Sequence, residues 1–196
     1  MNSIKFLFLH PKIADWRRLL SKCLLMLVFC LFIIGMQPAY AGIKDDVYEG
    51  NIFVVFAGNG SLVPAKQTLA QALEQHRPTM LAFYVDDSSD CKKYAIVISR
   101  VQEFYGRAVE IIPVNVDTIL PKQTYKPTEP GYYYSGGVPQ LVVFNQSGEV
   151  VLNKKGQVPY EEIDDRLREV FDLLPRTESV QLKRRAFNEY SSELAK

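Results

Sequence analysis

The fold of this chain is decided by residues 79–91, which read TMLAFYVDDSSDC. The apolar and β-favouring run from Thr79 to Val85 predicts a buried strand, and helical spacing begins at Lys92. A strand, two cysteines separated by two residues, and a helix are typical of a dithiol redox site. Here Ser88 stands where the first cysteine should be, and only Cys91 is left. The pattern therefore predicts a redox scaffold in which dithiol chemistry is disabled.

Residues 1–41 are interpreted as a targeting segment. Five basic residues precede an apolar run over residues 23–36, and Ala39 and Ala41 form a small-residue cleavage pattern. We therefore expect a signal peptide that is cut between Ala41 and Gly42. An uncleaved membrane anchor over residues 23–36 is the alternative, although this run is short for a straight spanning helix. A Sec signal is favoured over a twin-arginine signal because the run is so apolar.

Composition limits the partners of the mature chain. The full sequence has 23 Lys and Arg against 22 Asp and Glu, and the segment removes five basic residues and one acidic residue, which leaves 18 against 21. That balance gives no electrostatic reason to expect nucleic acid. Cys91 is the one cysteine left, so an internal disulfide is excluded. The remaining 155 residues suit one compact domain.

The mature chain predicts alternating strands and helices within residues 51–175. Residues 42–50 are predicted to form a flexible leader, and residues 176–196 a C-terminal extension with a helix over about 178–194. Pro113 places its strand at a sheet edge or a bulge. In order, the expected elements are a strand over 51–57, a helix from 64, a strand over 79–85, a helix from 88 to 106, a strand over 109–117, a long ordered loop over 118–135, a hairpin over 140–152 and a helix from 159 to 175.

In this order the elements resemble the thioredoxin family over residues 51–174. The resemblance rests on the strand at 79–85, on Cys91 and Lys92, and on the motifs VNVD at 114–117, GVPQ at 137–140 and SGE at 147–149. It implies an α/β thioredoxin fold, a central mixed sheet flanked by helices, here with an extra C-terminal helix. It also implies that Cys91 matches the resolving cysteine and Pro139 the cis-proline, whose preceding backbone pairs with a bound peptide.

Three catalytic parts of that family are replaced in this chain. Ser88 stands for the attacking cysteine, Asp87 for the tryptophan before it, and Ala82 for a buried aspartate that assists proton transfer. A serine hydroxyl cannot form a disulfide, so the exchange step has no nucleophile. The chain further resembles thioredoxin-like proteins of cyanobacterial photosynthetic membranes, which implies export to the thylakoid lumen or the periplasm.

Cys91 has two interpretations. A helix N-terminus lowers a thiol pKa and favours a reactive monothiol, whereas the surrounding acidic side chains of Asp86, Asp87 and Asp90 raise it. Cys91 also shares the inward stripe of its helix, which indicates a buried, inert thiol. The acidic residues are interpreted as a solvated helix start that supplies too few ligands for a metal, and no cofactor is expected.

The sequence favours protein binding over catalysis. We expect a binding surface formed by Ser88, Cys91, Val138 and Pro139 together with Tyr132, Tyr133 and Tyr134 of the proline- and tyrosine-rich loop. A packed cover over the sheet is the alternative role for that loop. The prediction is an exported assembly module whose partner is a protein, such as a subunit of a membrane complex. The alternative functions are a monothiol redox protein that uses Cys91 and a permanent, non-catalytic subunit of such a complex.

Overall fold

The computed structural model describes residues 11–35 and 42–179, in two units that divide near residue 41. The first unit contains helix α1, Pro11–Gly35. Within the described residues, no helix combines the length and the hydropathy that a membrane span requires. The expected cleavage pattern at residues 39–41 and the expected helix over 178–194 lie outside the described residues, apart from the two residues 178 and 179.

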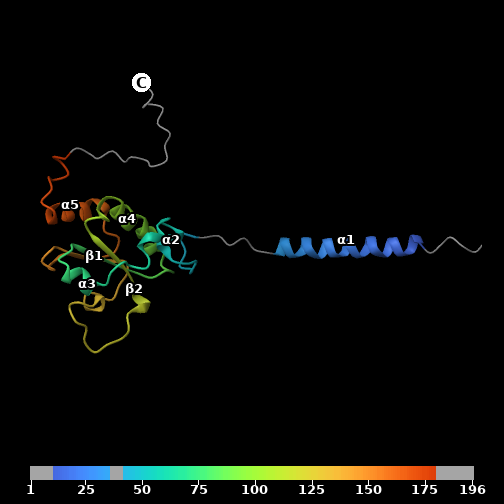
Figure 1. The fold of residues 1–196 in the computed structure, drawn as a ribbon, viewed down its shortest axis with the longest axis horizontal. Helices are drawn as coiled ribbons and strands as arrows, with labels where there is room; N and C mark the ends of the chain where they lie inside the picture. The colour runs from blue at the N-terminus through green and yellow to red at the C-terminus, as the bar shows by residue number, and fades with distance from the viewer. Residues whose placement is uncertain (1–10, 36–41, 180–196) are drawn as a thin grey trace, which may run out of the picture. The chain divides into compact units, whose positions relative to one another are not determined.

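The second unit is built on a four-stranded mixed sheet (Figure 1). Strand β1, Thr79–Tyr84, lies between the parallel strand β2, Glu110–Asn115, and the antiparallel strand β3, Gln140–Phe144. Strand β4, Val150–Lys155, pairs with the far side of β3 as a hairpin. The order β2-β1-β3-β4 puts β2 at an edge, which confirms the position predicted from its proline.

Helices cover both faces of the sheet, which explains why every residue of β1 is buried. One face packs on α2, Ile52–Val55, α4, Ser89–Tyr105, and α5, Tyr160–Val170. The other face packs on α3, Leu69–Glu74, and on the tyrosine-rich loop (Figure 1). Alternate β1 residues enter the two cores. The predicted mixed sheet flanked by helices is confirmed.

The predicted strand over residues 51–57 is wrong, because this stretch forms helix α2. Asn51 caps the helix by accepting a hydrogen bond from the Phe53 amide at 3.1 Å. Ile52 and Phe53 are buried side by side, while Val54 is 51% exposed and Val55 40% exposed. Adjacent burial of this kind fits one side of a helix and contradicts the alternation of a strand.

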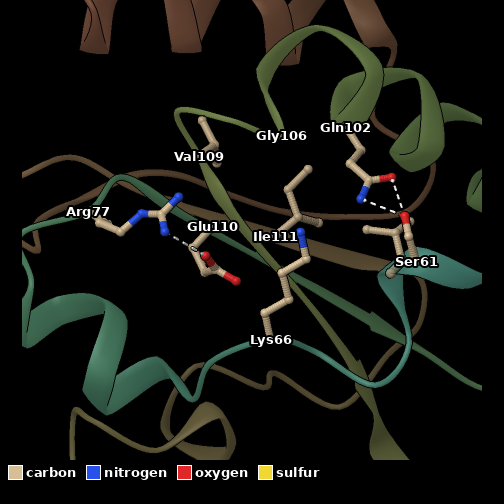
Figure 2. Close-up of a pocket in the computed structure, with 9 residues that line it drawn as sticks. Ser61, Lys66, Arg77, Gln102, Gly106, Val109, Glu110 and Ile111 are labelled. Atoms are coloured by element: carbon tan, nitrogen blue, oxygen red, sulfur yellow. Dashed lines mark hydrogen bonds and ion pairs between the residues drawn. The ribbon is translucent and has the colours of Figure 1, made fainter.

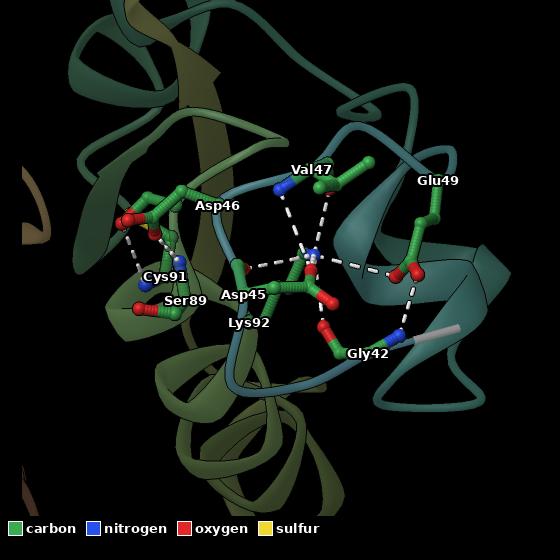
Figure 3. A network of polar contacts seen from close by, with 9 residues as sticks. Gly42, Asp45, Asp46, Val47, Glu49, Ser89, Cys91 and Lys92 are labelled. Atoms are coloured by element: carbon green, nitrogen blue, oxygen red, sulfur yellow. Dashed lines mark hydrogen bonds and ion pairs between the residues drawn. The ribbon is translucent and has the colours of Figure 1, made fainter. Parts of the chain in front are cut away.

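The helix predicted from Pro64 begins later, at Leu69. The reason is a capping box in which Thr68 accepts from the Gln71 amide and the Gln71 side chain accepts from the Thr68 amide. Residues 42–50 were expected to form a flexible leader. In the structure they lie against α4 and supply oxygen atoms to the Lys92 ammonium group (Figure 3), so a buried charge holds this segment on the domain.

Candidate functional site

Three strand ends meet at one end of the sheet. In the strand register Tyr84 lies opposite Asn115 of β2, and Phe83 lies opposite Gln140 of β3. Because β1 and β3 are antiparallel, the end of β1 meets the start of β3. The segment that follows β1 therefore begins α4 at the same end of the sheet as Pro139, whose peptide bond with Val138 is cis as expected.

Ser88 caps α4, as the sequence predicts. Its hydroxyl accepts a hydrogen bond from the Cys91 amide at 3.3 Å, and its backbone is extended in the manner of an N-cap. Ser89, the next residue, donates its amide to the Asp46 carboxylate at 2.8 Å. The position that belongs to an attacking thiol in a dithiol site is therefore occupied by a helix cap.

Cys91 lies in the hydrophobic core and is only 1% exposed. Burial raises the pKa of this thiol, and the charges of Asp90 and Asp87 raise it further, against hydrogen bonds from Ser88 and Val85 that lower it. A thiolate is therefore disfavoured at neutral pH, and the side chain has no open path to a reagent. The structure agrees with the interpretation of Cys91 as a buried thiol.

Asp86 was interpreted as part of a solvated helix start, and this is wrong. Its carboxylate accepts from the Ile52 amide and from the Asn115 side chain, both at 2.9 Å, and so joins α2 to the end of β2. Burial raises the pKa of Asp86, although these two hydrogen bonds partly oppose it. A carboxylate directly after a buried strand was the only sequence signal for this role.

The tyrosine-rich loop divides into packed and exposed parts. The ring of Tyr133 lies 4.9 Å from that of Phe144, and the ring of Tyr134 lies 5.5 Å from that of Phe83, so these two tyrosines cover the sheet. Tyr132 is 55% exposed. Tyr132 is therefore exposed, whereas Tyr133 and Tyr134 pack on the sheet face that carries Phe83 and Phe144, opposite to the face that buries Cys91.

Gln140 fastens this loop to the sheet. Its fully buried side chain accepts hydrogen bonds from the amide and the hydroxyl of Ser135, at 2.9 and 3.0 Å. It also donates to the Tyr133 carbonyl at 2.8 Å and to the Asn153 side chain at 2.9 Å. No sequence pattern predicts this residue's role, because its partners come from the loop and from β4.

A pocket lies at the opposite end of the sheet, and polar residues that line it pair with one another (Figure 2). Arg77 and the buried carboxylate of Glu110 form an ion pair at 3.2 Å. On the far side, Gln102 donates to the Ser61 hydroxyl at 3.1 Å. The buried charge is matched within the domain, so this pocket presents no unpaired carboxylate to a ligand. In the part of the chain that the structure describes, no three His, Cys, Asp or Glu side chains are grouped to hold a metal ion.

Lys92 has a structural role that the sequence does not predict. Its side chain is completely buried, and its ammonium group donates to oxygens of residues 42–49. Burial alone would lower the pKa of Lys92, but hydrogen bonds and charge from Asp45 and Glu49 outweigh it and raise the pKa. Because these partners lie more than 40 positions earlier in the chain, sequence spacing gives no hint of them.

The sequence is similar to one family model and to two proteins of Synechocystis sp.. A family model described as a thioredoxin-like domain matches residues 65–171. A thylakoid membrane protein of Synechocystis sp. is 49% identical over 192 residues, which are 94% of this chain and 96% of that protein. A thiol:disulfide interchange protein homologue of the same organism is 30% identical over 91 residues, 46% of this chain and 48% of that protein.

The solved structures are less similar in sequence than the Synechocystis membrane protein. A mutant thioredoxin from Halobacterium salinarum is 20% identical, with a TM-score of 0.41, and the match covers 53% of this chain and 83% of that one. The similarity to the Synechocystis membrane protein, by contrast, extends over almost the whole length of both chains.

Proposed function

The chain belongs to the thioredoxin-like family, and from that premise we propose that it is an exported protein-binding module that helps to assemble or stabilise a membrane complex. The proposal is carried by what Ser88 and Cys91 do at the two cysteine positions of the dithiol motif. Ser88 is a helix cap, and Cys91 is 1% exposed. What remains available at this end of the sheet is a surface for contact.

Thiol–disulfide exchange needs a thiolate that can reach the disulfide of its partner. Ser88 has no sulfur, and its hydroxyl is engaged with the Cys91 amide. Ala82, at the position of the family's buried aspartate, is buried in the same core as Cys91 and brings no carboxyl to the thiol. These residues supply neither the nucleophile nor the proton acceptor of a dithiol reaction.

The binding surface that we propose consists of Ser88 and Val138, which are half-buried, and the exposed Tyr132, with the buried Pro139 holding the backbone before β3. Val138 and Pro139 lead directly into β3 at the end of the sheet, where an extended segment of a partner can pair with backbone groups. Tyr132 adds an exposed aromatic ring, a side chain type that protein interfaces favour. Tyr133 and Tyr134 pack on one face of the sheet and Cys91 on the other, so these three residues hold the elements that carry the surface.

The membrane setting of the proposal comes from similarity. The protein that is 49% identical is a thylakoid membrane protein, which supports a role at a thylakoid membrane. The basic region, the apolar run and the small-residue pattern of residues 1–41 support export, with the lumen or the periplasm as the working compartment. The partner on this proposal is a subunit of a membrane complex.

The alternative is a monothiol redox protein that uses Cys91 with an external thiol. The observation that favours it is the partial similarity to a thiol:disulfide interchange protein homologue. This alternative requires Cys91 to become accessible, because the thiol is buried in the described domain. Replacement of Cys91 therefore separates the two functions.

The test is site-specific photo-crosslinking in the native membranes. We expect a crosslinker at Tyr132 or at Val138 to capture the same membrane-complex subunit, and we expect Cys91→Ser to leave this capture unchanged. A crosslinker at Arg166, an exposed residue on α5, is the matched control and should not capture that subunit. Equal capture from Arg166, no capture from either surface position, or loss of capture in Cys91→Ser would contradict the proposal.

A further inference from the structure

The Lys92 ammonium group lies in a cage of oxygen atoms (Figure 3). It donates to the carbonyl oxygens of Gly42 at 3.0 Å, Asp45 at 3.2 Å and Val47 at 2.7 Å. It also contacts the carboxylates of Asp45 at 3.0 Å and Glu49 at 3.3 Å. All five oxygens come from one short segment, so residues 42–49 are folded around a single cation.

The charges of this cage do not balance. Lys92 brings one positive charge, whereas Asp45, 48% exposed, and Glu49, only 13% exposed, bring two negative charges. Lys44, in the same segment, is exposed. Asp46 points the other way, to the Ser89 amide, and the neutral ring of Phe56 faces Lys92 from the α2 side. Desolvation of an unmatched carboxylate is unfavourable. A second cation next to Glu49 would complete the cage.

The nitrogen of Gly42 lies where that second cation is needed. It donates a hydrogen bond to Oε1 of Glu49, while Oε2 of the same carboxylate accepts from the Lys92 ammonium group. The Glu49 carboxylate therefore lies between the Gly42 nitrogen and the Lys92 nitrogen (Figure 3). A Cβ on Gly42 would lie 1.8 Å from a carboxylate oxygen of Asp45, so a side chain here would displace that carboxylate. Glycine at this position therefore leaves the Asp45 carboxylate in place beside Lys92.

We propose that the chain is cut at the peptide bond between Ala41 and Gly42, and that Glu49 is the binding site for the new α-ammonium group of Gly42. A signal peptidase hydrolyses this bond with one water molecule. Ala41 leaves with a carboxylate, and the Gly42 nitrogen takes protons and becomes an ammonium group. The cage then holds two cations and two carboxylates. The cut rests on the export proposed above, whereas the residues of this site are other than those of the proposed protein-binding surface.

The first test is the N-terminus of the protein purified from its native cells. Intact mass and N-terminal sequencing should give Gly42 as the first residue, with a free amine. A protein that keeps residues before Gly42, or that begins at another position, would overturn the proposal.

The second test is the labelling of the Gly42 amine in the processed protein, followed by peptide mass spectrometry. An adjacent carboxylate raises an amine pKa above its usual range of about 7.7 to 8.0, so at pH 7 we expect about tenfold slower labelling in the native protein than in urea. Glu49→Gln should remove most of this protection. Glu161→Gln, at an exposed position on α5, is the matched control and should keep it.

Steric protection alone would slow labelling without shifting the pH dependence. The pH profile of the native wild-type protein is therefore measured as well, and it decides the question even if Glu49→Gln does not fold. An apparent amine pKa above about 8 is expected. An apparent pKa within or below the usual range, or labelling as fast as in urea, would overturn the assignment of Glu49.

Discussion

Replacement of Gln140 by leucine is expected to lower the free energy of unfolding by about 2 to 3 kcal/mol and to release the tyrosine-rich loop from the sheet. The buried amide of Gln140 makes four hydrogen bonds, two of them to the loop backbone at Ser135 and Tyr133. Leucine has a similar volume but no polar atoms, so it would leave these partly buried groups without their protein partner. Loss of the anchor should also change the position of Tyr132.

Urea denaturation of the wild-type and Gln140→Leu proteins measures the first effect. Gln75→Leu is the matched control, because Gln75 is exposed at the end of α3, and its change should stay within about 0.5 kcal/mol. Crosslinking from Tyr132 should be lost in Gln140→Leu and kept in the control. A Gln140→Leu protein as stable as the control, or one that still crosslinks from Tyr132, would contradict the role given to Gln140.

Replacement of Phe53 by alanine is expected to cost about 3 to 5 kcal/mol of folding free energy. Phe53 is 1% exposed in α2, and its ring meets that of Tyr84 edge to face with centroids 5.1 Å apart. The truncation removes this contact and leaves a cavity beneath the end of β1, beside the segment that leads to Ser88. Chemical denaturation again gives the measurement.

Val54→Ala and Val55→Ala are the controls for Phe53→Ala, and they also test the structure of α2. Both valines are 40% or more exposed, so each truncation should change stability by no more than about 0.5 kcal/mol. In the strand that the sequence predicted, Phe53 and Val55 would share the buried face. A cost for Val55→Ala close to that of Phe53→Ala would therefore favour the strand over the helix.

The parts of the fold that sequence predicted well are those fixed by local pattern. The buried strand after residue 78, the serine cap of α4 and the hairpin of β3 and β4 each follow from composition and turn residues nearby. The strand predicted for residues 51–57 is wrong because a short, uniformly apolar stretch carries no period that distinguishes a strand from a helix. Its helical form depends on Asn51 and on the distant carboxylate of Asp86.

The candidate site was predictable in its chemistry and less so in its geometry. The replacement of the attacking cysteine by Ser88 is visible in the sequence, and so is the proline that precedes β3. The sequence does not show that Cys91 and Lys92 are buried, or that Gln140 anchors the loop. Each depends on atoms brought together from distant segments, such as residues 42–49 around Lys92.

Taken together, these features describe a redox scaffold whose remaining thiol is part of the core. The cap at Ser88 stabilises the start of α4, and the same helix buries Cys91 against the sheet. At this end Asp87 and Asp90 are exposed at the start of α4, and Val138 is half-buried before β3. The central claim is therefore that the surface works by contact and that Cys91 takes no part in exchange.

The pH dependence of Cys91 alkylation in the folded protein tests this claim most directly, with the Cys91 peptide followed by mass spectrometry so that Cys23 and Cys30 do not contribute. Because burial raises the pKa of Cys91, the thiolate fraction at neutral pH is small and the reagent has no access. We predict slow labelling, with an apparent pKa above the usual value of about 8.5, and a large acceleration in urea. Rapid labelling of the native protein with an apparent pKa below about 8.5 would contradict the account and establish Cys91 as a reactive monothiol.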